Sequence, residues 1–165
     1  MKDKFIKYFM KVAEESAALS YARRLQVGCV IVKDKRILSF GYNGTPSGWD
    51  NNCEDRIYAN EWSIDNDIWN YQDETGRPYN LKTKEEVLHA EANALLKLAA
   101  STESSEGAIL FITHAPCMGC AKLIYQARIS HVIYKEEYKD SSGIDFLIKC
   151  GVGVDLYKDL LTPEE

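Results

Sequence analysis

FITHAPCMGCAKLIYQARISHVIY, residues 111–134, is the stretch that decides the fold class of this chain. Its first residues belong to an apolar, strand-like run over 108–113, and its last residues form a second such run over 131–134. Between them, residues 117–127 have the pattern of a helix. Two strands joined by a helix form a crossover unit, in which the strands are parallel. The stretch therefore predicts an α/β fold, in which helices cover a sheet.

The same alternation of strands and helices extends outward in both directions. Apolar residues at three- and four-residue spacing predict an amphipathic helix over 3–19. Two apolar runs joined by a short charged turn predict a β-hairpin over 27–44. The remaining predicted elements are helices over 85–100 and 142–150 and a strand over 152–157. This order predicts a largely parallel sheet, to which the hairpin adds an antiparallel edge.

The segment 46–84, between the hairpin and the next helix, is too long for a plain loop. It holds all three tryptophans, Trp49, Trp62 and Trp69, together with many acidic residues. The acidic residues argue against a separately packed small domain, so one domain is expected over 1–165. We interpret 46–84 as an insertion that packs its own aromatic side chains, as a lid or a subunit contact, in preference to a direct substrate role.

Composition excludes several classes of protein. A chain of 165 residues with 45% hydrophobic and 27% charged residues is an ordinary globular domain, without the ~18-residue apolar run of a membrane span. A net charge of −5 argues against long nucleic acid as a partner. The five cysteines are an odd number, and the first residues show no secretory signal. A cytoplasmic location with reduced thiols is therefore expected.

Two short motifs carry metal-binding chemistry. Cys117 and Cys120 lie three residues apart at the start of a predicted helix, where free N–H groups and the helix dipole favour thiolates. His89, on another predicted helix, would add an imidazole. Three such ligands with an open fourth position are typical of catalytic zinc, whereas a structural zinc needs a fourth protein ligand. The candidates for that fourth ligand are His114 and His131.

Glu91, two residues after His89, has the chemistry of a general acid and base. Its carboxylate can take a proton from a metal-activated water and pass it to a substrate. The order H-x-E followed by P-C-x-x-C is the signature of zinc deaminases that act on nucleobases. Each half alone is weak evidence, since CxxC also occurs in redox pairs, but together the two halves predict a zinc site.

The chain resembles the dCMP deaminases of the cytidine deaminase superfamily over nearly all of its length outside the insertion. The resemblance rests on the stretches ARRLQVGCVIV, RILSFGYNGTPSG, HAEANAL, THAPCMGCAKLIYQARISHVIY and KCGVGVDLY. GYNGTPSG distinguishes this branch from nucleoside, tRNA and polynucleotide deaminases. The resemblance implies a three-layer α/β/α fold with a five-stranded mixed sheet, which agrees with the predicted order of elements.

The resemblance also implies roles for individual residues. It implies one zinc ion per chain, with the ligands His89, Cys117 and Cys120 and with Glu91 as the proton shuttle. The substrate residues that it implies are Arg24, Asn43, Thr45, Ala90 and Tyr138. Arg24 falls near the sugar-phosphate, where a guanidinium suits a monophosphate, and Tyr138 falls against the base. A solvated arginine, an ordinary half-buried tyrosine and an Asn-Gly turn remain alternative interpretations of these positions.

In this family the turn Gly41-Tyr42-Asn43-Gly44 is associated with a nucleoside triphosphate site. There dCTP activates and dTTP inhibits, commonly in a homohexamer. Glycines let backbone N–H groups approach phosphates, and Mg²⁺ would accompany the triphosphate. A plain strand-ending turn is the alternative interpretation.

The sequence departs from the family pattern before the first strand. Many phage and bacterial relatives have a cysteine there, as part of a second, structural zinc site, whereas this chain has Ala22. We therefore expect a single zinc, and we interpret Cys29, Cys53 and Cys150 as ordinary thiols.

The predicted activity is the hydrolytic deamination of dCMP to dUMP and ammonia, which would feed dTMP synthesis in the cytoplasm, or in the host cytoplasm if a virus encodes the chain. Three alternatives stay open. The first is another pyrimidine nucleoside, nucleotide or nucleobase deaminase of the superfamily. The others are a CxxC redox protein and a non-catalytic nucleotide-binding regulator. The last two leave His89 or Glu91 without a clear role.

Overall fold

The computed structural model describes residues 1–59 and 68–161 of the chain, so Trp62 lies outside the described residues. Its elements are α1 (Asp3–Ala17), β1 (Gly28–Lys33), β2 (Arg36–Tyr42), β3 (Glu54–Tyr58), β4 (Tyr71–Gln72), β5 (Pro78–Thr83), α2 (Ala90–Ala99), β6 (Ile109–His114), α3 (Met118–Gln126), β7 (His131–Glu136), α4 (Ser142–Lys149), β8 (Gly153–Leu156) and the 3-10 helix η1 (Tyr157–Leu160). Within this part of the chain, no helix has both the length and the apolar character that crossing a membrane requires.

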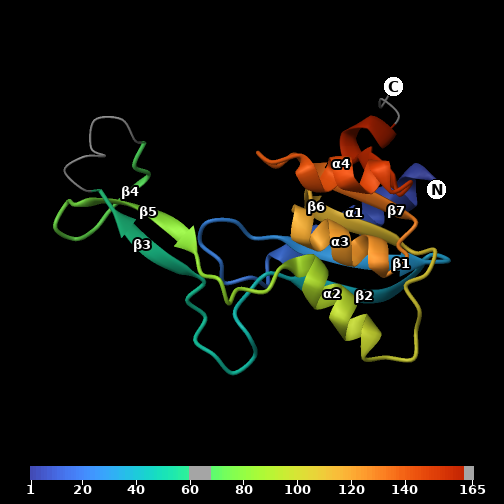
Figure 1. Cartoon of the computed structure of the whole chain (residues 1–165), viewed down its shortest axis with the longest axis horizontal. Coiled ribbons are helices and arrows are strands. Elements are labelled where there is room, and N and C mark those ends of the chain that lie inside the picture. Colours follow the sequence, from blue (N-terminus) through green and yellow to red (C-terminus); the bar gives the residue numbers. More distant parts are fainter. Residues whose placement is uncertain (60–67, 162–165) are drawn as a thin grey trace.

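The main sheet has five strands in the order β2-β1-β6-β7-β8 (Figure 1). β6, β7 and β8 are parallel, as the sequence around 111–134 predicts. β1 is antiparallel both to its hairpin partner β2 and to β6. The sheet is therefore mixed, as the family resemblance implies. The expectation of a largely parallel sheet is correct only for β6, β7 and β8, because the hairpin enters the sheet through β1 and makes two antiparallel pairings.

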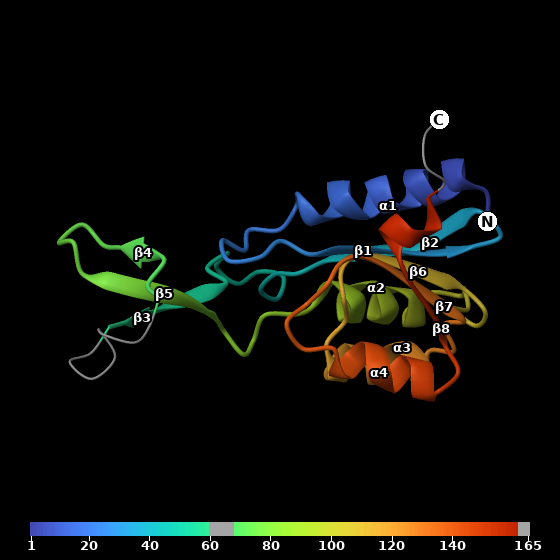
Figure 2. The same ribbon diagram turned by 90° about the horizontal axis from the view of Figure 1, so that it is seen from above.

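Helices cover both faces of this sheet, which gives three layers (Figure 2). Alternate residues of each central strand point to opposite faces. Cys29, Ile31, Leu110 and Ile112 pack in the core cluster of α2, α3 and α4, whereas the strand residues between them pack against α1. Since both faces are buried, the central strands are continuous apolar runs. α1 contributes the apolar face that its spacing predicts, with Phe9 and Met10 almost completely buried.

The helix α2 begins at Ala90, five residues later than its predicted start. Leu88 is held in extended backbone by a bridge to Gly44. The Leu88 N–H donates to the Gly44 carbonyl at 2.8 Å, and the Gly44 N–H donates to the Leu88 carbonyl at 3.1 Å. Because this bridge excludes helical geometry at residue 88, His89 becomes the N-cap of α2. The shift places His89 and Glu91 at the very start of the helix.

The insertion contains three strands that the sequence does not predict. They form a separate antiparallel sheet in the order β3-β5-β4, which projects from one side of the five-stranded body (Figures 1 and 2). The Tyr79 ring on β5 lies 5.6 Å from that of Tyr58 and 5.4 Å from that of Tyr71, between ring centroids. The packing predicted for the aromatic side chains of the insertion is therefore present for these three tyrosines. Trp49 is exposed.

Two glycines of the hairpin permit helices to lie directly on the sheet. A Cβ atom on Gly41 of β2 would lie 2.2 Å from the Ala90 carbonyl oxygen of α2, and one on Gly28 of β1 would lie 2.1 Å from the Ala13 carbonyl oxygen of α1. Real Cβ atoms do not approach backbone this closely. Gly41 is therefore explained by the packing of α2, the helix that begins with the candidate site residues.

We expect Gly41→Ala to lower the free energy of unfolding by about 1–3 kcal/mol, because α2 must move away from β2 to admit the methyl group. Gly44→Ala is the matched control, since a Cβ atom there has nothing within 4 Å. We expect that control to change stability by at most about 0.5 kcal/mol. Urea denaturation measures both values, and equal stability of the two variants would contradict this account of Gly41.

Candidate active site

The candidate metal ligands come from the starts of two helices. His89 is the N-cap of α2 and Cys117 is the N-cap of α3, while Cys120 lies in the first turn of α3. The His89 Nδ1 atom lies 3.6 Å from the Cys117 sulfur and 3.4 Å from the Cys120 sulfur. All three ligand atoms lie within 4.8 Å of one another. The structure thus brings together the three residues that the sequence predicts as metal ligands.

These distances fit a tetrahedral zinc ion. With usual Zn–S and Zn–N bond lengths, a sulfur and a nitrogen on the same ion lie roughly 3.5 Å apart. The two measured S···N distances, 3.6 and 3.4 Å, lie on either side of that value. Two thiols and one imidazole are also the donor set of catalytic zinc sites, which keep a fourth position for water or substrate. The donor atoms present here therefore fit Zn²⁺ in both type and spacing.

The environment of the ligand cluster favours a thiolate at Cys117. Hydrogen bonds with Cys120 and then with His89 lower the pKa of Cys117 to about 3. The same contact with Cys117, together with burial, raises the pKa of Cys120, so the first proton leaves from Cys117. The hydrogen bond with Cys117 also raises the pKa of His89. Two helix N-termini point at this cluster, and their dipoles add to the preference for negative charge.

Glu91 lies in the first turn of α2 with only 4% of its surface exposed. Burial raises the pKa of its carboxyl to about 7, although its own backbone N–H and the nearby His89 partly oppose the shift. The carboxyl also contacts the Cys120 thiol, which places it beside the metal ligands. A carboxyl with a pKa near 7 can both accept and release a proton at neutral pH.

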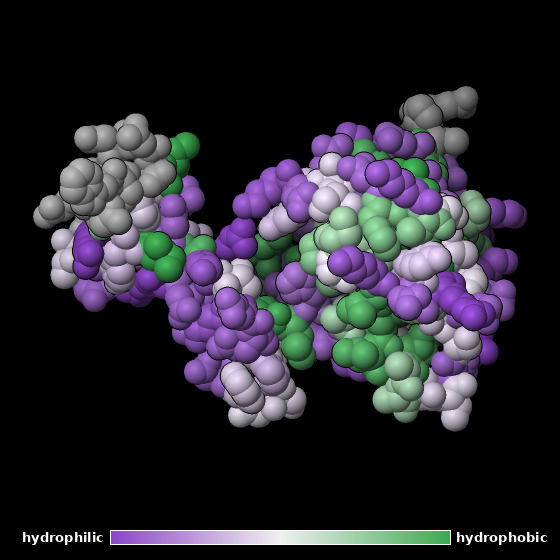
Figure 3. Space-filling model, in the orientation of Figure 1, coloured by the Kyte–Doolittle hydropathy of each residue, from purple (hydrophilic) through white to green (hydrophobic). Residues whose placement is uncertain are grey.

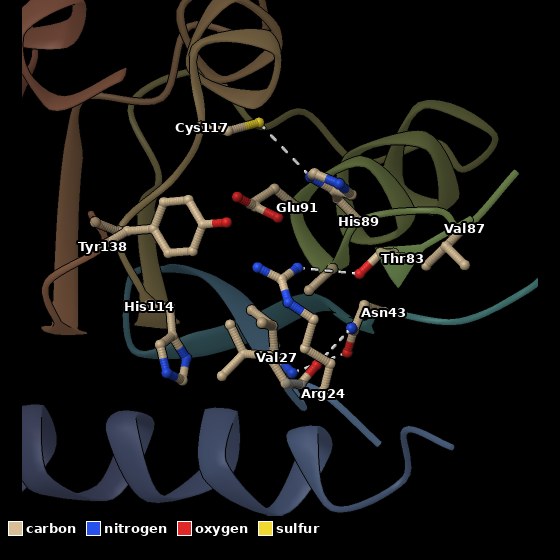
Figure 4. Close-up of a pocket in the computed structure, with 13 residues that line it drawn as sticks. Arg24, Val27, Asn43, Thr83, Val87, His89, Glu91, His114, Cys117 and Tyr138 are labelled. Atoms are coloured by element: carbon tan, nitrogen blue, oxygen red, sulfur yellow. Dashed lines mark hydrogen bonds between the residues drawn. The ribbon is translucent and has the colours of Figure 1, made fainter. Parts of the chain in front are cut away.

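A single pocket is lined by Glu91, by two of the three candidate metal ligands, His89 and Cys117, and by most of the predicted substrate residues (Figure 4). In this view Arg24 enters the pocket from below Glu91 and Tyr138 from the left, and the Tyr138 hydroxyl points toward the Glu91 carboxyl. Ala90 lies between His89 and Glu91 and is completely buried. The pocket is lined by Arg24, Leu25, Val27, Asn43, Thr83, Val87, His89, Ala90, Glu91, His114, Ala115, Cys117 and Tyr138.

The structure separates Asn43 from Thr45. Asn43 lines the pocket, and its side chain accepts a hydrogen bond from the Val27 N–H at 2.8 Å and donates one to the Leu25 carbonyl at 2.9 Å. Asn43 thus holds the backbone that forms the pocket wall. Thr45 does not line the pocket, because its hydroxyl donates to the Asp50 carbonyl at 2.6 Å and closes a surface turn.

In the turn 41–44, the N–H groups of Asn43 and Gly44 are not free, although the glycines of the turn suggest that they would be. The Asn43 N–H donates to the Val27 carbonyl and the Gly44 N–H donates to the Leu88 carbonyl, both at 3.1 Å. Gly41 and Tyr42 pair with β1. The backbone argument for phosphate binding is therefore wrong for Asn43 and Gly44, whose N–H groups already have partners within the chain.

Other histidines and cysteines lie outside the ligand group. His114 lines the pocket at the end of β6, where its Nδ1 contacts the Thr113 hydroxyl at 3.1 Å. His131 lies at the start of β7 and pairs with Asp155 at 2.6 Å. Cys53 is buried in a small apolar cluster with Ala22 and Val87.

Sequence reasoning missed Thr83 and the apolar pocket wall. Thr83 is the last residue of β5, and its hydroxyl accepts a hydrogen bond from Arg24 Nη1 at 3.2 Å. It belongs to the insertion, which the sequence analysis separates from substrate binding. Leu25, Val27 and Val87 carry no distinctive chemistry, so no local signal identifies them. His114 had one usable signal, its place at the carboxyl end of a parallel strand, where α/β sheets bind ligands.

Two curated relatives share much of this sequence. Deoxycytidylate deaminase of Saccharomyces cerevisiae is 35% identical over 155 residues, which cover 93% of this chain and 45% of the yeast protein. ComE operon protein 2 of Bacillus subtilis is 36% identical over 132 residues, which cover 80% of this chain and 59% of the bacterial protein. The chain therefore spans about half the length of these two relatives.

A solved structure covers nearly the whole chain. It is the crystal structure of dCMP deaminase from the cyanophage S-TIM5 in complex with dCMP and dUMP, with a TM-score of 0.76 and 39% sequence identity. The match covers 94% of this chain and 98% of the phage chain. The sequence also matches the family model of the cytidine and deoxycytidylate deaminase zinc-binding region over residues 3–136. Since that match contains both halves of the ligand group and most of the main sheet, this chain belongs to the cytidine and deoxycytidylate deaminase family.

Proposed function

We propose that this chain deaminates dCMP hydrolytically to dUMP and ammonia. The observation that carries the proposal is one pocket lined by His89 and Cys117 of a zinc-type ligand group, by a buried carboxyl with a pKa near 7 and by a guanidinium. The likeness to the S-TIM5 enzyme, whose structure contains dCMP and dUMP, supports the same substrate here. Production of dUMP would feed dTMP synthesis, and a cytoplasmic location stays a prediction.

In the proposed mechanism Glu91 transfers two protons. When bound by His89, Cys117 and Cys120, a zinc ion supplies the Lewis acidity that lowers the pKa of water toward ~7. The Glu91 carboxylate accepts a proton from the water that attacks C4 of cytosine and delivers it to N3. It then moves the remaining hydroxyl proton to the amino group, which leaves as ammonia. A raised pKa suits both directions of transfer.

Recognition is assigned to the other pocket residues. The Arg24 guanidinium offers charge-assisted hydrogen bonds to the substrate monophosphate. Tyr138 lines the same pocket as Arg24 and provides a ring for the pyrimidine, and the Ala90 backbone meets the edge of the base. Asn43 keeps the pocket wall in place through its bonds to residues 25 and 27. Thr45 is a proposed substrate residue only through the family resemblance.

Regulation by dCTP as activator and dTTP as inhibitor, with Mg²⁺ bound to the triphosphate, is also a proposal. The family resemblance supports it at the turn Gly41-Tyr42-Asn43-Gly44. A positively charged side chain lies beside this turn: the Lys97 ammonium is 5.6 Å from the centre of the Tyr42 ring. Since the N–H groups of Asn43 and Gly44 are already bonded, the side chains would have to bind the phosphates.

We also propose that copies of this chain assemble into a homo-oligomer, specifically a hexamer. Apolar side chains on α2 and α3 support it: Leu96 is 64% exposed and Leu123 is 43% exposed. Figure 3 shows apolar surface over these two helices, on the face that the body presents in that view. Exposed apolar surface that gathers in one place is typical of protein contact sites.

We expect Glu91→Gln to lower kcat for dCMP by about 100- to 10,000-fold while the protein keeps its zinc, because the amide cannot transfer a proton. The measurement is the loss of ultraviolet absorbance with dCMP, together with metal analysis of wild type and variant. Near-normal turnover with zinc retained would contradict the mechanism. A reversible disulfide between Cys117 and Cys120 in a zinc-free, inactive wild type would favour the CxxC redox alternative.

We expect Arg24→Ala to raise KM for dCMP at least about tenfold, because a charge-assisted contact to phosphate is lost. Turnover of deoxycytidine, which has no phosphate, should keep its KM. Steady-state kinetics with both substrates measures the contrast. An equal rise in KM for the nucleoside would show that Arg24 shapes the pocket without binding the phosphate.

We expect dCTP with Mg²⁺ to lower the apparent KM for dCMP and dTTP with Mg²⁺ to raise it, by about five- to 150-fold for a typical allosteric coupling. Lys97→Gln should weaken both responses. Rates are measured with each effector, and sedimentation velocity reports the subunit number of the same samples. Absence of any response to either triphosphate in wild type would refute the proposed regulation, while a monomer would refute the proposed assembly.

A further inference from the structure

The first strand of the insertion begins with a buried acid whose carboxylate is hydrogen-bonded to the segment before β1. Glu54, the first residue of β3, has only 1% of its side chain exposed. Its Oε1 atom accepts hydrogen bonds from the backbone N–H groups of Arg23 at 3.0 Å and Arg24 at 3.1 Å. The Arg23 Nε donates to its Oε2 at 3.3 Å. A buried carboxylate needs such compensation, so these bonds fix the backbone at residues 23 and 24.

The two neighbouring arginines have different partners. Besides the Glu54 carboxylate, Arg23 donates to the Glu54 carbonyl at 3.2 Å and to the Asn52 side chain at 3.0 Å. All of its described hydrogen bonds therefore go to the base of the insertion. Arg24 makes no ion pair with a carboxylate in residues 1–59 and 68–161, and its Nη1 donates to Thr83 at 3.2 Å. The charge of Arg23 compensates Glu54, which leaves the charge of Arg24 available to the pocket.

Both contacts to Arg24 come from one cross-strand pair. Glu54 of β3 and Thr83 of β5 are directly opposite each other in the small sheet. Glu54 holds the Arg24 backbone, and Thr83 holds its guanidinium. Figure 4 shows the guanidinium between Thr83 and Glu91, inside the pocket. Glu54 and Thr83, at the base of the insertion, thus hydrogen-bond to Arg24 at two points. We call these two residues the Glu54–Thr83 clamp.

We propose that the Glu54–Thr83 clamp positions Arg24 for the monophosphate of the substrate, and that the insertion therefore takes part in substrate selection. The inference rests on the proposed function and adds two positioning residues to it. An arginine side chain has many rotamers, and a side chain held in its binding geometry before the ligand arrives loses less entropy on binding. Among the described residues, the side chains of Glu54 and Thr83 hydrogen-bond to Arg23 and Arg24 and not to a metal ligand or to Glu91. The clamp should therefore change substrate affinity and leave the chemistry at C4 unchanged.

The test is a set of variants of the zinc-loaded protein with two substrates. Thr83→Val removes the hydroxyl but keeps the branched shape, so we expect KM for dCMP to rise roughly threefold, the loss of about one ordinary hydrogen bond. Glu54→Gln removes the carboxylate charge and should raise KM for dCMP further, to about tenfold above wild type. In both variants kcat for dCMP and KM for deoxycytidine should stay within about twofold of wild type. Thr83→Ser keeps the hydroxyl and should restore KM for dCMP.

Asp55→Asn is the matched control for Glu54→Gln, because it makes the same kind of change at the next, exposed residue of β3. It should leave both KM values as in wild type. In an Arg24→Ala background, Thr83→Val should have no further effect on KM for dCMP. The proposal is overturned if the clamp variants change KM equally for dCMP and deoxycytidine, if they leave KM for dCMP unchanged, or if their effects persist without Arg24.

Binding separates this inference from the proposed function. Calorimetry in a Glu91→Gln background measures the affinity for intact dCMP without turnover. If wild type binds dCMP but does not deaminate it, the proposed reaction fails, and the clamp is judged by whether Thr83→Val weakens binding of dCMP but not of deoxycytidine. If wild type does not bind dCMP at all, both proposals are overturned. Melting temperatures of all variants identify any loss that comes from unfolding.

Discussion

The site depends on two helices, α2 and α3, whose N-termini lie side by side at one end of the strands of the main sheet. His89 and Cys117 are far apart in the chain, yet their ligand atoms lie 3.6 Å apart because α2 and α3 pack on the same face and start at the same end of the strands. Gly41 lets α2 lie directly on β2. Both helix N-termini then direct backbone N–H groups and positive dipole ends at one point, where thiolates are stabilised. The metal ligands, the Glu91 carboxyl and the pocket all follow from this packing.

Two buried carboxyls next to this pocket have opposite environments. Glu91 is buried beside the Cys120 thiol, and burial raises the pKa of its carboxyl to about 7, so it can exchange protons. Glu54 receives two backbone N–H groups and the Arg23 guanidinium, so its charge is fully compensated. The first arrangement suits proton transfer and the second suits the fixing of a backbone. A buried glutamate thus transfers protons in the case of Glu91 and holds backbone in place in the case of Glu54, because the groups around the two carboxyls differ.

Local patterns in the sequence predict those elements that show an apolar face or an apolar run within their own residues. The apolar runs of β1, β6 and β7 and the amphipathic face of α1 are visible without tertiary information, since each element buries its own face. The start of α2 was wrong by five residues because the bridge between Leu88 and Gly44 is a long-range contact. The three strands of the insertion were missed because they are short and pack through tyrosines and arginines, with no apolar alternation to mark them.

The chemistry of the site is readable from the amino-acid sequence, because His89, Glu91, Cys117 and Cys120 form a spaced pattern of reactive groups that few other functions explain. The order of the main strands and helices along the chain is readable in the same way. Which residues surround that chemistry depends on the tertiary structure. Thr83, Glu54 and Val27 acquire their roles from hydrogen bonds and contacts across long sequence separations, and Thr45 loses its place in the pocket by bonding within a turn. Ligand chemistry is a property of residue types, whereas the shape of a pocket is a property of how distant segments pack.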